Sequence, residues 1–292
     1  MRASVHGFED SRPIAEGLAK ALAMPLRAVA VHRFPDGESL VTAPDPAGHA
    51  ILVRSLDDPN AKLVEVLLAA SALRDGGAAR LTLVVPYLAY MRQDIAFVPG
   101  QAVSQRIICR WLADSFDAVV TAAPHLHRVH RLDELFSGRV AIAADVAVDL
   151  AALLGLGGTR VLLGPDEESE PMVAAIARIT HDRFAVARKV RRDDRSVEVE
   201  LPALDPGGRD VVLIDDVISS GMTMASAARL VLAKGAKSVE AACCHALFDA
   251  KAAQTMADAG IRRVQSCDSV PHPSNARSLV PSLAAALRTL SP

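Results

Sequence analysis

Short apolar runs alternate with segments of helical periodicity along the chain. Leu26 to His32, Ala50 to Val53 and Leu81 to Val85 are rich in aliphatic and β-branched residues, a composition that favours strands. Ser11 to Leu22 and Asn60 to Leu73 carry apolar residues three and four apart, as on one face of a helix. Strands that alternate with helices predict βα units and a mostly parallel sheet.

The same alternation continues to the end of the chain. Residues 101–113 form the next expected helix, which places Trp111 in the core, and residues 118–121 read as a strand; residues 140–145 begin the expected hinge region. A helical run to residue 154 and a glycine-rich stretch at 155–158 then precede a second series of βα units. Further strands are expected at 160–163, 184–187, 197–201, 211–214 and 239–247 and again up to Cys267, with helices at 224–234, at 250–259 and at the C-terminus. We therefore predict an α/β fold of two domains, residues 1–145 and 146–292.

The most informative stretch runs from Val211 to Thr223. Four apolar residues end in Asp215 and Asp216, and a turn of small residues, Ser219-Ser-Gly221, leads into a helix. Such a turn lets backbone N–H groups converge at a helix N-terminus, where an anion is favoured. No lysine follows the glycine, so the loop is not of the Walker type. The acids can accept hydrogen bonds from sugar hydroxyls or hold a hydrated divalent cation. The stretch predicts a ribose 5-phosphate cradle; a βα turn with solvent-facing acids is the structural alternative.

Other candidate residues also follow expected strands. Arg92, Gln93 and Asp94 come after the strand at 81–85, His125 after the strand at 118–121, and Asp166 after the strand at 160–163. Open α/β sheets bind ligands at the carboxyl ends of their strands. A histidine in that position can present a neutral imidazole to a metal, whereas we interpret His127 and His130 as structural.

Residues 188–195 join the strands expected at 184–187 and 197–201, and they carry five cations and two acids. A polar hairpin tip is the structural interpretation of this segment.

Composition narrows the class of protein. The net charge of −2 and the pI near 6.5 provide no basic field for nucleic acid. No apolar run reaches 18 residues and no basic-then-apolar leader is present. The four cysteines lack C-x-x-C spacing, as is usual for reduced, buried thiols. We expect a cytoplasmic protein that binds neither membranes nor nucleic acid.

Five short motifs together resemble one enzyme family. The stretch at 211–223 is similar to the signature shared by phosphoribosyltransferases and ribose-phosphate diphosphokinases (PRPP synthetases). Phe34-Pro-Asp-Gly-Glu38, Pro86-Tyr87 with Arg92-Gln-Asp94, Pro124-His125 and Lys189-x-Arg191 resemble the PRPP synthetases in particular, in the same order. The resemblance implies two type I phosphoribosyltransferase-like domains. It also implies transfer of the β,γ-diphosphoryl group of Mg-ATP to the 1-hydroxyl of ribose 5-phosphate, which gives PRPP and AMP.

The resemblance also implies roles for particular residues and an assembly. A neighbouring subunit of a homodimer or larger homo-oligomer would supply part of the ATP site. The ATP-binding residues would be Phe34, Asp36, Glu38, Arg92, Gln93 and Asp94; the ribose-5-phosphate-binding residues Asp215, Asp216, Ser219, Ser220, Gly221, Met222 and Thr223; the Mg²⁺ ligands His125 and Asp166; and the catalytic residues Lys189 and Arg191, on a mobile loop.

Several positions depart from the pattern of many family members. Ala123 replaces an acid, Ile95 replaces a basic residue, Ser219-Ser220 replaces Asp-Thr, and Pro165 to Ser169 replaces a glycine-rich turn. These features resemble the shorter, archaeal-type branch. Two alternatives remain open: a phosphoribosyltransferase, which would leave the motifs of residues 34–94 unexplained, and a non-catalytic regulatory homologue, which retention of Lys189 and Arg191 argues against.

Overall fold

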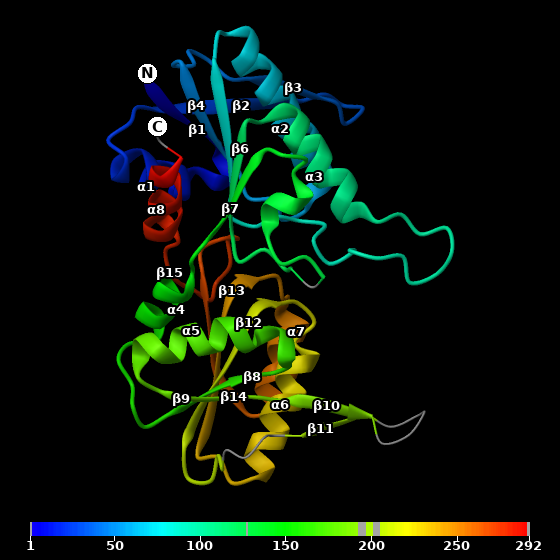
Figure 1. The fold of residues 1–292 in the computed structure, drawn as a ribbon, viewed down its shortest axis with the longest axis vertical. Coiled ribbons are helices and arrows are strands. Elements are labelled where there is room, and N and C mark those ends of the chain that lie inside the picture. Colours follow the sequence, from blue (N-terminus) through cyan, green and yellow to red (C-terminus); the bar gives the residue numbers. More distant parts are fainter. Residues whose placement is uncertain (1, 127, 192–196, 201–204, 291–292) are drawn as a thin grey trace. The chain divides into compact units, whose positions relative to one another are not determined.

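Two compact units make up the protein (Figure 1). The computed structural model describes residues 2–126, 128–191, 197–200 and 205–290. The first unit takes in the chain up to Asp145 and returns for the segment from Leu279, and the second unit runs from Val146 to Ser278. Each contains a mostly parallel sheet between helices, so the predicted α/β fold is confirmed. No helix in the described part of the chain is both long and apolar enough to span a bilayer.

The first unit contains a seven-stranded sheet in the order β3-β2-β1-β4-β5-β6-β7. All neighbours are parallel except β2 and β3, which form an antiparallel hairpin. The central strands are buried on both faces, as is usual for parallel sheets. The strands are β1 Ala3–Phe8, β2 Leu26–Arg33, β3 Ser39–Thr42, β4 His49–Val53, β5 Arg80–Val85, β6 Ala118–Ala122 and β7 Val140–Ala144.

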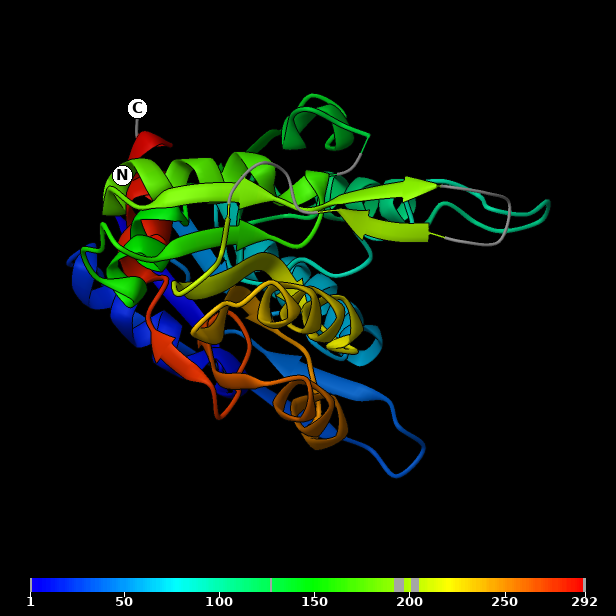
Figure 2. The same ribbon diagram turned by 90° about the horizontal axis from the view of Figure 1, so that it is seen from below.

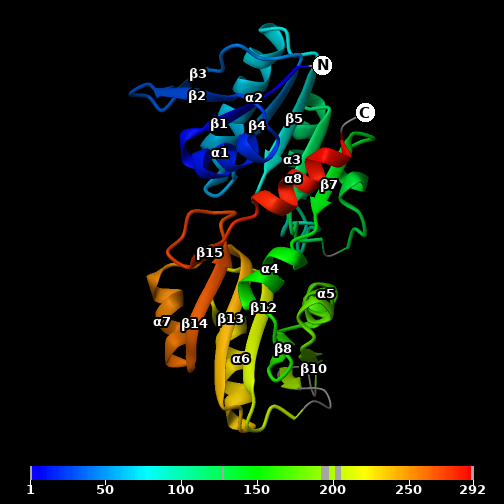
Figure 3. The same cartoon turned by 90° about the vertical axis from the view of Figure 1, so that its left-hand side faces the viewer.

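Helices cover both faces of this sheet. They are α1 Arg12–Ala21, α2 Pro59–Asp75, α3 Ser104–Ser115 and α8 Val280–Thr289. The crossover from β1 to β2 runs in the opposite direction along the sheet to those from β4 to β5 and from β5 to β6. Because parallel crossovers are right-handed, α1 lies on one face and α2 and α3 on the other. Figure 3 shows α8 on the same side as α1.

The C-terminal helix differs from the sequence prediction, which placed it in the second domain. In the structure α8 packs against α1, β6 and β7 of the first unit. Its Leu283 and Leu287 are buried, and Arg288 Nη2 donates to the carbonyl of Ala21 at 2.8 Å. The apolar stripe of α8 thus completes the face that α1 covers only in part.

The second unit contains a wholly parallel six-stranded sheet in the order β15-β14-β13-β12-β8-β9. Its crossovers run in opposite directions from β8 and β12, so the helix pairs α4/α5 and α6/α7 cover opposite faces. The strands are β8 Val161–Gly164, β9 Arg183–Val186, β12 Asp210–Ile218, β13 Ser238–Ala246, β14 Ile261–Cys267 and β15 Asn275–Arg277; the helices are α4 Ala147–Leu154, α5 Glu170–Thr180, α6 Met222–Ala233 and α7 Ala250–Asp258.

A separate two-stranded hairpin corrects the expected connection between residues 184 and 201. The strand β9 belongs to the main parallel sheet, whereas β10 Arg188–Arg191 pairs antiparallel with β11 Val197–Glu200. Part of the segment interpreted as a hairpin tip is therefore a strand. Figure 2 shows this pair as a ribbon distinct from the main sheet.

Trp111 also differs from its prediction as a core residue. Its side chain is 50% exposed, because α3 buries the stripe that contains Ile108 and Leu112. Trp111 lies with the exposed Ile107 on the outer stripe of the same helix.

Candidate functional site

Three carboxylates converge at one edge of the second unit's sheet. Leu213 of β12 pairs with Leu163 of β8, and Asp166, two residues after the end of β8, lies close enough to affect the charge of Asp215. Asp215 precedes Asp216 within β12, which continues to Ile218. The sequence had placed both acids at the end of the strand, so the structure moves them slightly inside it. The predicted sugar acids and the predicted metal ligand Asp166 thus share one edge.

The electrostatics of this edge are unfavourable to three full negative charges. Burial, followed by the charge of Asp216, raises the pKa of Asp215 to about 8, and Asp166 adds to the shift. The backbone N–H of Asp216 donates to Asp215 Oδ1 at 2.9 Å, which partly offsets it. A cation, or hydroxyl groups that donate hydrogen bonds, would relieve this repulsion.

The loop after β12 has the form that the sequence predicts. Gly221 adopts a positive φ of 71° and precedes the first residue of α6, Met222. A Cβ at position 221 would lie 3.1 Å from the carbonyl oxygen of Ala252, so both conformation and space require glycine. The first-turn N–H groups of α6, which include those of Met222 and Thr223, start directly after this turn.

A cavity of about 420 Å³ lies beside this loop. Its walls come from the loop and from the start of α7, and they are formed by Ser219, Ser220, Met222, Leu247, Asp249, Lys251, Ala252 and Thr255. Asp249 is the N-cap of α7, and its side chain accepts from Ala252 N at 2.8 Å. Lys251 places a cation beside the predicted phosphate loop. Lys251 cannot be linked to this loop from sequence alone, because it lies 28 residues beyond Thr223 in a helix with no motif of its own.

The turn that carries Asp166 is closely packed. Ser169 donates to the carbonyl of Asp166 through its side chain at 2.6 Å and its backbone N–H at 3.2 Å. A Cβ at Gly164 would come within 2.1 Å of Ser169 Oγ. The end of β8 therefore needs glycine at position 164 to hold Asp166 at the edge of the sheet.

In the first unit, the residues from Phe34 to Glu38 form the loop between β2 and β3. Phe34 N donates to the carbonyl of Glu38 at 2.8 Å, and Glu38 N donates to Asp36 Oδ1 at 3.1 Å. The ring of His32 lies edge-on to Phe34 with centroids 4.9 Å apart, and Phe34 is 41% exposed. The loop presents an exposed aromatic ring and carboxylates, while Asp36 also fixes its turn.

The predicted residues 92–94 are held by side chains from distant parts of the sequence. Asp94 is buried and accepts from Arg128 Nη1 at 2.7 and 2.8 Å. The buried Gln105 of α3 donates from its side chain to the carbonyl of Met91 and from its backbone to that of Gln93, each at 3.3 Å. Asp94 thus joins two loops, and Arg92 stays exposed beside it.

His125 follows Ala123, whose φ of 34° is unusual for a residue other than glycine. Strained backbone of this kind is common at functional sites. His125 lies in the first unit and Asp166 in the second, and the described residues contain no group of three or more His, Cys, Asp or Glu arranged to hold a metal. His127 lies outside the described residues.

Lys189 and Arg191 lie in β10, where their backbones pair with Val199 and Val197. Their side chains lie outside the described part of the structure.

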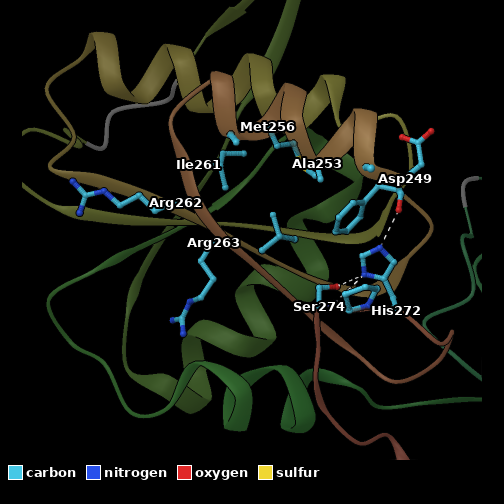
Figure 4. Close-up of a pocket in the computed structure, with 13 residues that line it drawn as sticks. Asp249, Ala253, Met256, Ile261, Arg262, Arg263, His272 and Ser274 are labelled. Carbon is cyan, nitrogen blue, oxygen red and sulfur yellow. Dashed lines mark hydrogen bonds between the residues drawn. The ribbon is translucent and has the colours of Figure 1, made fainter.

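A second cavity of about 540 Å³ lies between α7 and β14 in the second unit (Figure 4). Its polar side chains already have partners: His272 bonds Ser274 and the carbonyl of Phe248, and Arg263 pairs with Glu240. The rest of the wall is apolar, with Met256, Ile261 and Val264 among its residues. The cavity beside residues 219–222 is therefore the better candidate for an anionic ligand.

Comparison with known proteins gives a consistent assignment. Residues 4–115 match the family model of the N-terminal domain of ribose phosphate pyrophosphokinase, and residues 140–279 match the phosphoribosyl transferase domain. The chain is 34% identical over 276 residues to the ribose-phosphate pyrophosphokinase of Methanopyrus kandleri, which covers 94% of each chain. It is 34% identical over 265 residues to that of Saccharolobus solfataricus, which covers 88% and 89%.

A solved structure supports the same fold. The crystal structure of phosphoribosylpyrophosphate synthetase from Mycobacterium smegmatis superposes with a TM-score of 0.82 at 24% identity over 99% of both chains. With archaeal relatives similar over nearly their full length, the chain belongs to the ribose-phosphate pyrophosphokinase family.

Proposed function

We propose that this protein transfers the β,γ-diphosphoryl group of Mg-ATP to the 1-hydroxyl of ribose 5-phosphate. The hydroxyl oxygen would attack the β-phosphorus and give up its proton to solvent, the bond from that phosphorus to the oxygen that bridges it to the α-phosphorus would break, and AMP would leave with that oxygen. The observation that carries the proposal is that Asp215 and Asp216 lie shortly before the glycine turn that begins α6, in a chain that belongs to this family.

The sugar phosphate suits the second unit. Ser219, Ser220, Gly221, Met222 and Thr223 would surround the 5-phosphate with hydroxyl and backbone donors, and the helix dipole would favour its charge. Asp215 and Asp216 would accept hydrogen bonds from the ribose hydroxyls. Lys251, which lines the neighbouring cavity, would add a positive charge.

The nucleotide suits the first unit. We assign the adenine to the exposed ring of Phe34, with Asp36 and Glu38 near the nucleoside and Arg92, Gln93 and Asp94 on the loop after β5. Arg128 donates a hydrogen bond to Asp94, so Asp94 would fix the position of that loop.

We assign Mg²⁺ binding to Asp166 of the second unit and, separately, to His125 of the first. The crowding of Asp166 with Asp215 and Asp216, which contributes to the raised pKa of Asp215, supports a cation there, and carboxylate oxygens are the ligands that Mg²⁺ prefers. When bound, the ion would neutralise charge on the transferred group. Lys189 and Arg191 would stabilise the charge that develops on the phosphoryl oxygens.

We also infer assembly into a homodimer or larger homo-oligomer. Val64 and Leu68 of α2 and Ile107 and Trp111 of α3 are exposed apolar residues, and such surfaces are typical of subunit contacts. The four buried free cysteines in the described chain support the expected cytoplasmic location.

Incubation with ribose 5-phosphate, Mg²⁺ and ATP should release AMP and PRPP in equal amounts. Nuclear magnetic resonance of phosphorus identifies both products. Release of ADP, or absence of nucleotide turnover, would contradict the proposed reaction and favour the transferase or non-catalytic alternatives.

Replacement of Lys189 or Arg191 by alanine should lower kcat at least about 10²-fold and change nucleotide affinity little, because each cation acts mainly in the transition state. Steady-state kinetics and calorimetry with ATP separate the two effects. Arg188→Ala, one residue away on the same strand, is the matched control and should retain activity. Unchanged turnover in both variants would remove the pair from the mechanism.

The double variant Asp215→Asn/Asp216→Asn should weaken the use of ribose 5-phosphate roughly tenfold or more, because carboxylates accept stronger hydrogen bonds from hydroxyls than amides do. ATP affinity should change much less. Calorimetric titration with each substrate gives the order of the two losses, and the reverse order would assign the acids to the nucleotide.

The raised pKa of Asp215 also predicts a pH-dependent stability. An unfolded aspartate ionises near pH 4, whereas folded Asp215 keeps its proton to about pH 8. Its contribution to stability is therefore lost as pH rises through that interval. Asp215→Asn removes the effect, so the variant should melt roughly 3 °C or more above the wild type at pH 8, with a smaller difference at pH 5.

Asp210 at the other end of β12 provides the control for this measurement. The hydrogen bond from Ser238 lowers the pKa of Asp210, so Asp210→Asn should not raise the melting temperature at pH 8. A gain for Asp215→Asn that is equal at both pH values would contradict the titration argument.

A further inference from the structure

We propose that Glu65 is a positioning residue that fixes the nucleotide loop Phe34–Glu38. The inference rests on the proposed function, because it assigns a support to the loop that would hold ATP. Glu65 lies on α2, with no exposed surface, and it belongs to none of the motifs that the sequence analysis singled out.

One carboxylate oxygen of Glu65 contacts both strands of the hairpin. Ser39 Oγ donates to Glu65 Oε1 at 2.8 Å, and Arg33 Nη2 lies 3.3 Å from the same oxygen. Arg33 and Ser39 are directly opposite each other in the β2–β3 register. Arg33 is the last residue of β2 and Ser39 is the first residue of β3, so the two flank the loop. Glu65 therefore fixes the base of the loop from both sides.

The other oxygen of Glu65 is fixed by a buried cation. Arg54 Nη1 lies 2.6 Å from Glu65 Oε2, and the side chain of Arg54 is only 5% exposed. The guanidinium of Arg54 also stacks over the ring of Phe8 at 4.0 Å and donates to Asp10 Oδ2 at 2.9 and 3.1 Å. These contacts connect the carboxylate of Glu65 to the ends of β1 and β4. The carboxylate is therefore a fixed point against which the hairpin is held.

The carboxylate is held in its charged form. Burial alone would raise the pKa of Glu65, but the hydrogen bond from Ser39, the ion pair with Arg54 and the charge of Arg33 outweigh it and lower the pKa. A buried ion pair is often no more stabilising than apolar residues of the same size. The arrangement is therefore better explained by the geometry it imposes than by stability.

The hairpin needs such a support because it extends beyond the rest of the sheet. β1 ends at Phe8, opposite Val29, whereas β2 continues to Arg33. The last four residues of β2 extend roughly 13 Å further and pair with β3. A two-stranded hairpin is marginal by itself, and the hydrogen bonds inside the loop are local. Contact with α2 supplies the tertiary restraint.

The test compares affinities for the two substrates. Glu65→Gln keeps the shape of the side chain and removes its charge, so the KM for ATP and the calorimetric Kd for Mg-ATP should rise roughly tenfold or more. The Kd for ribose 5-phosphate should stay within about twofold. Ser39→Ala is a milder change that leaves the buried ions in place, and it should also raise the Kd for Mg-ATP. Ser39→Thr keeps the hydroxyl and should bind Mg-ATP as the wild type does.

Asp117→Asn is the matched control in the same unit. Asp117 pairs with Arg74 at 2.7 Å and accepts from Leu81 N at 2.8 Å, and it does not contact the hairpin. Its loss should lower the melting temperature without raising the KM for ATP. Unchanged ATP affinity in Ser39→Ala and Glu65→Gln would overturn the proposal. So would equal losses for both substrates, or the same ATP effect in Asp117→Asn.

Failure of the proposed function gives a different result. In that case the wild type releases no AMP, whereas failure of the inference alone leaves an active wild type and a Glu65→Gln variant with ordinary ATP affinity. Should Glu65→Gln not fold, Ser39→Ala and its threonine counterpart decide the question.

Discussion

The candidate chemistry of this protein depends on the alignment of parallel strands. In the second unit β8 and β12 pair in parallel up to Leu163 and Leu213, so the turn after β8 that carries Asp166 lies at the same edge of the sheet as Asp215 and Asp216. The result is a half-buried set of acids that repel one another, and the pKa of Asp215 is raised to about 8. Because carboxylates this close together repel one another, the binding of a cation or of hydroxyl donors would relieve that repulsion and gain free energy.

In the first unit, polar contacts fix the loops that carry the candidate residues. Its candidate residues lie on loops, which have few backbone partners of their own. Gln105 holds the backbone of Met91 and Gln93, Arg128 holds Asp94, and Glu65 holds the base of the β2–β3 hairpin. Each of these supports is a side chain with a fixed partner. Loops arranged in this way lose little conformational entropy on binding, which is the general advantage of preorganised sites.

Periodicity and motif chemistry in the sequence predict the βα units, the parallel sheets and the acids of β12. These features are local, since a buried strand and a glycine turn are each encoded in a few consecutive residues. The supports are not local: Ser39 and Glu65 are 26 residues apart, and Asp94 and Arg128 are 34 apart. Without the fold, Glu65 in the largely apolar helix α2 would be interpreted as an ordinary charge that faces solvent. For the same reason Trp111 and the terminal helix were placed wrongly, because the sequence shows which residues are apolar but not which surface covers them.

The candidate acids and the candidate cations of the second unit lie in different sheets. The acids are part of a six-stranded sheet, whereas Lys189 and Arg191 lie on β10, which pairs with β11 in a sheet of its own. Two-stranded sheets have little independent stability. If these cations act on the transferred phosphoryl group, a hairpin of low independent stability would allow them to approach only when substrates are bound. Their approach would then exclude water that could otherwise accept the diphosphoryl group. If Asp215 and Asp216 bind the sugar, they have the opposite requirement, because their geometry would select the hydroxyl that attacks. With these roles, the parallel sheet would hold the acids in place while the separate hairpin carries the cations.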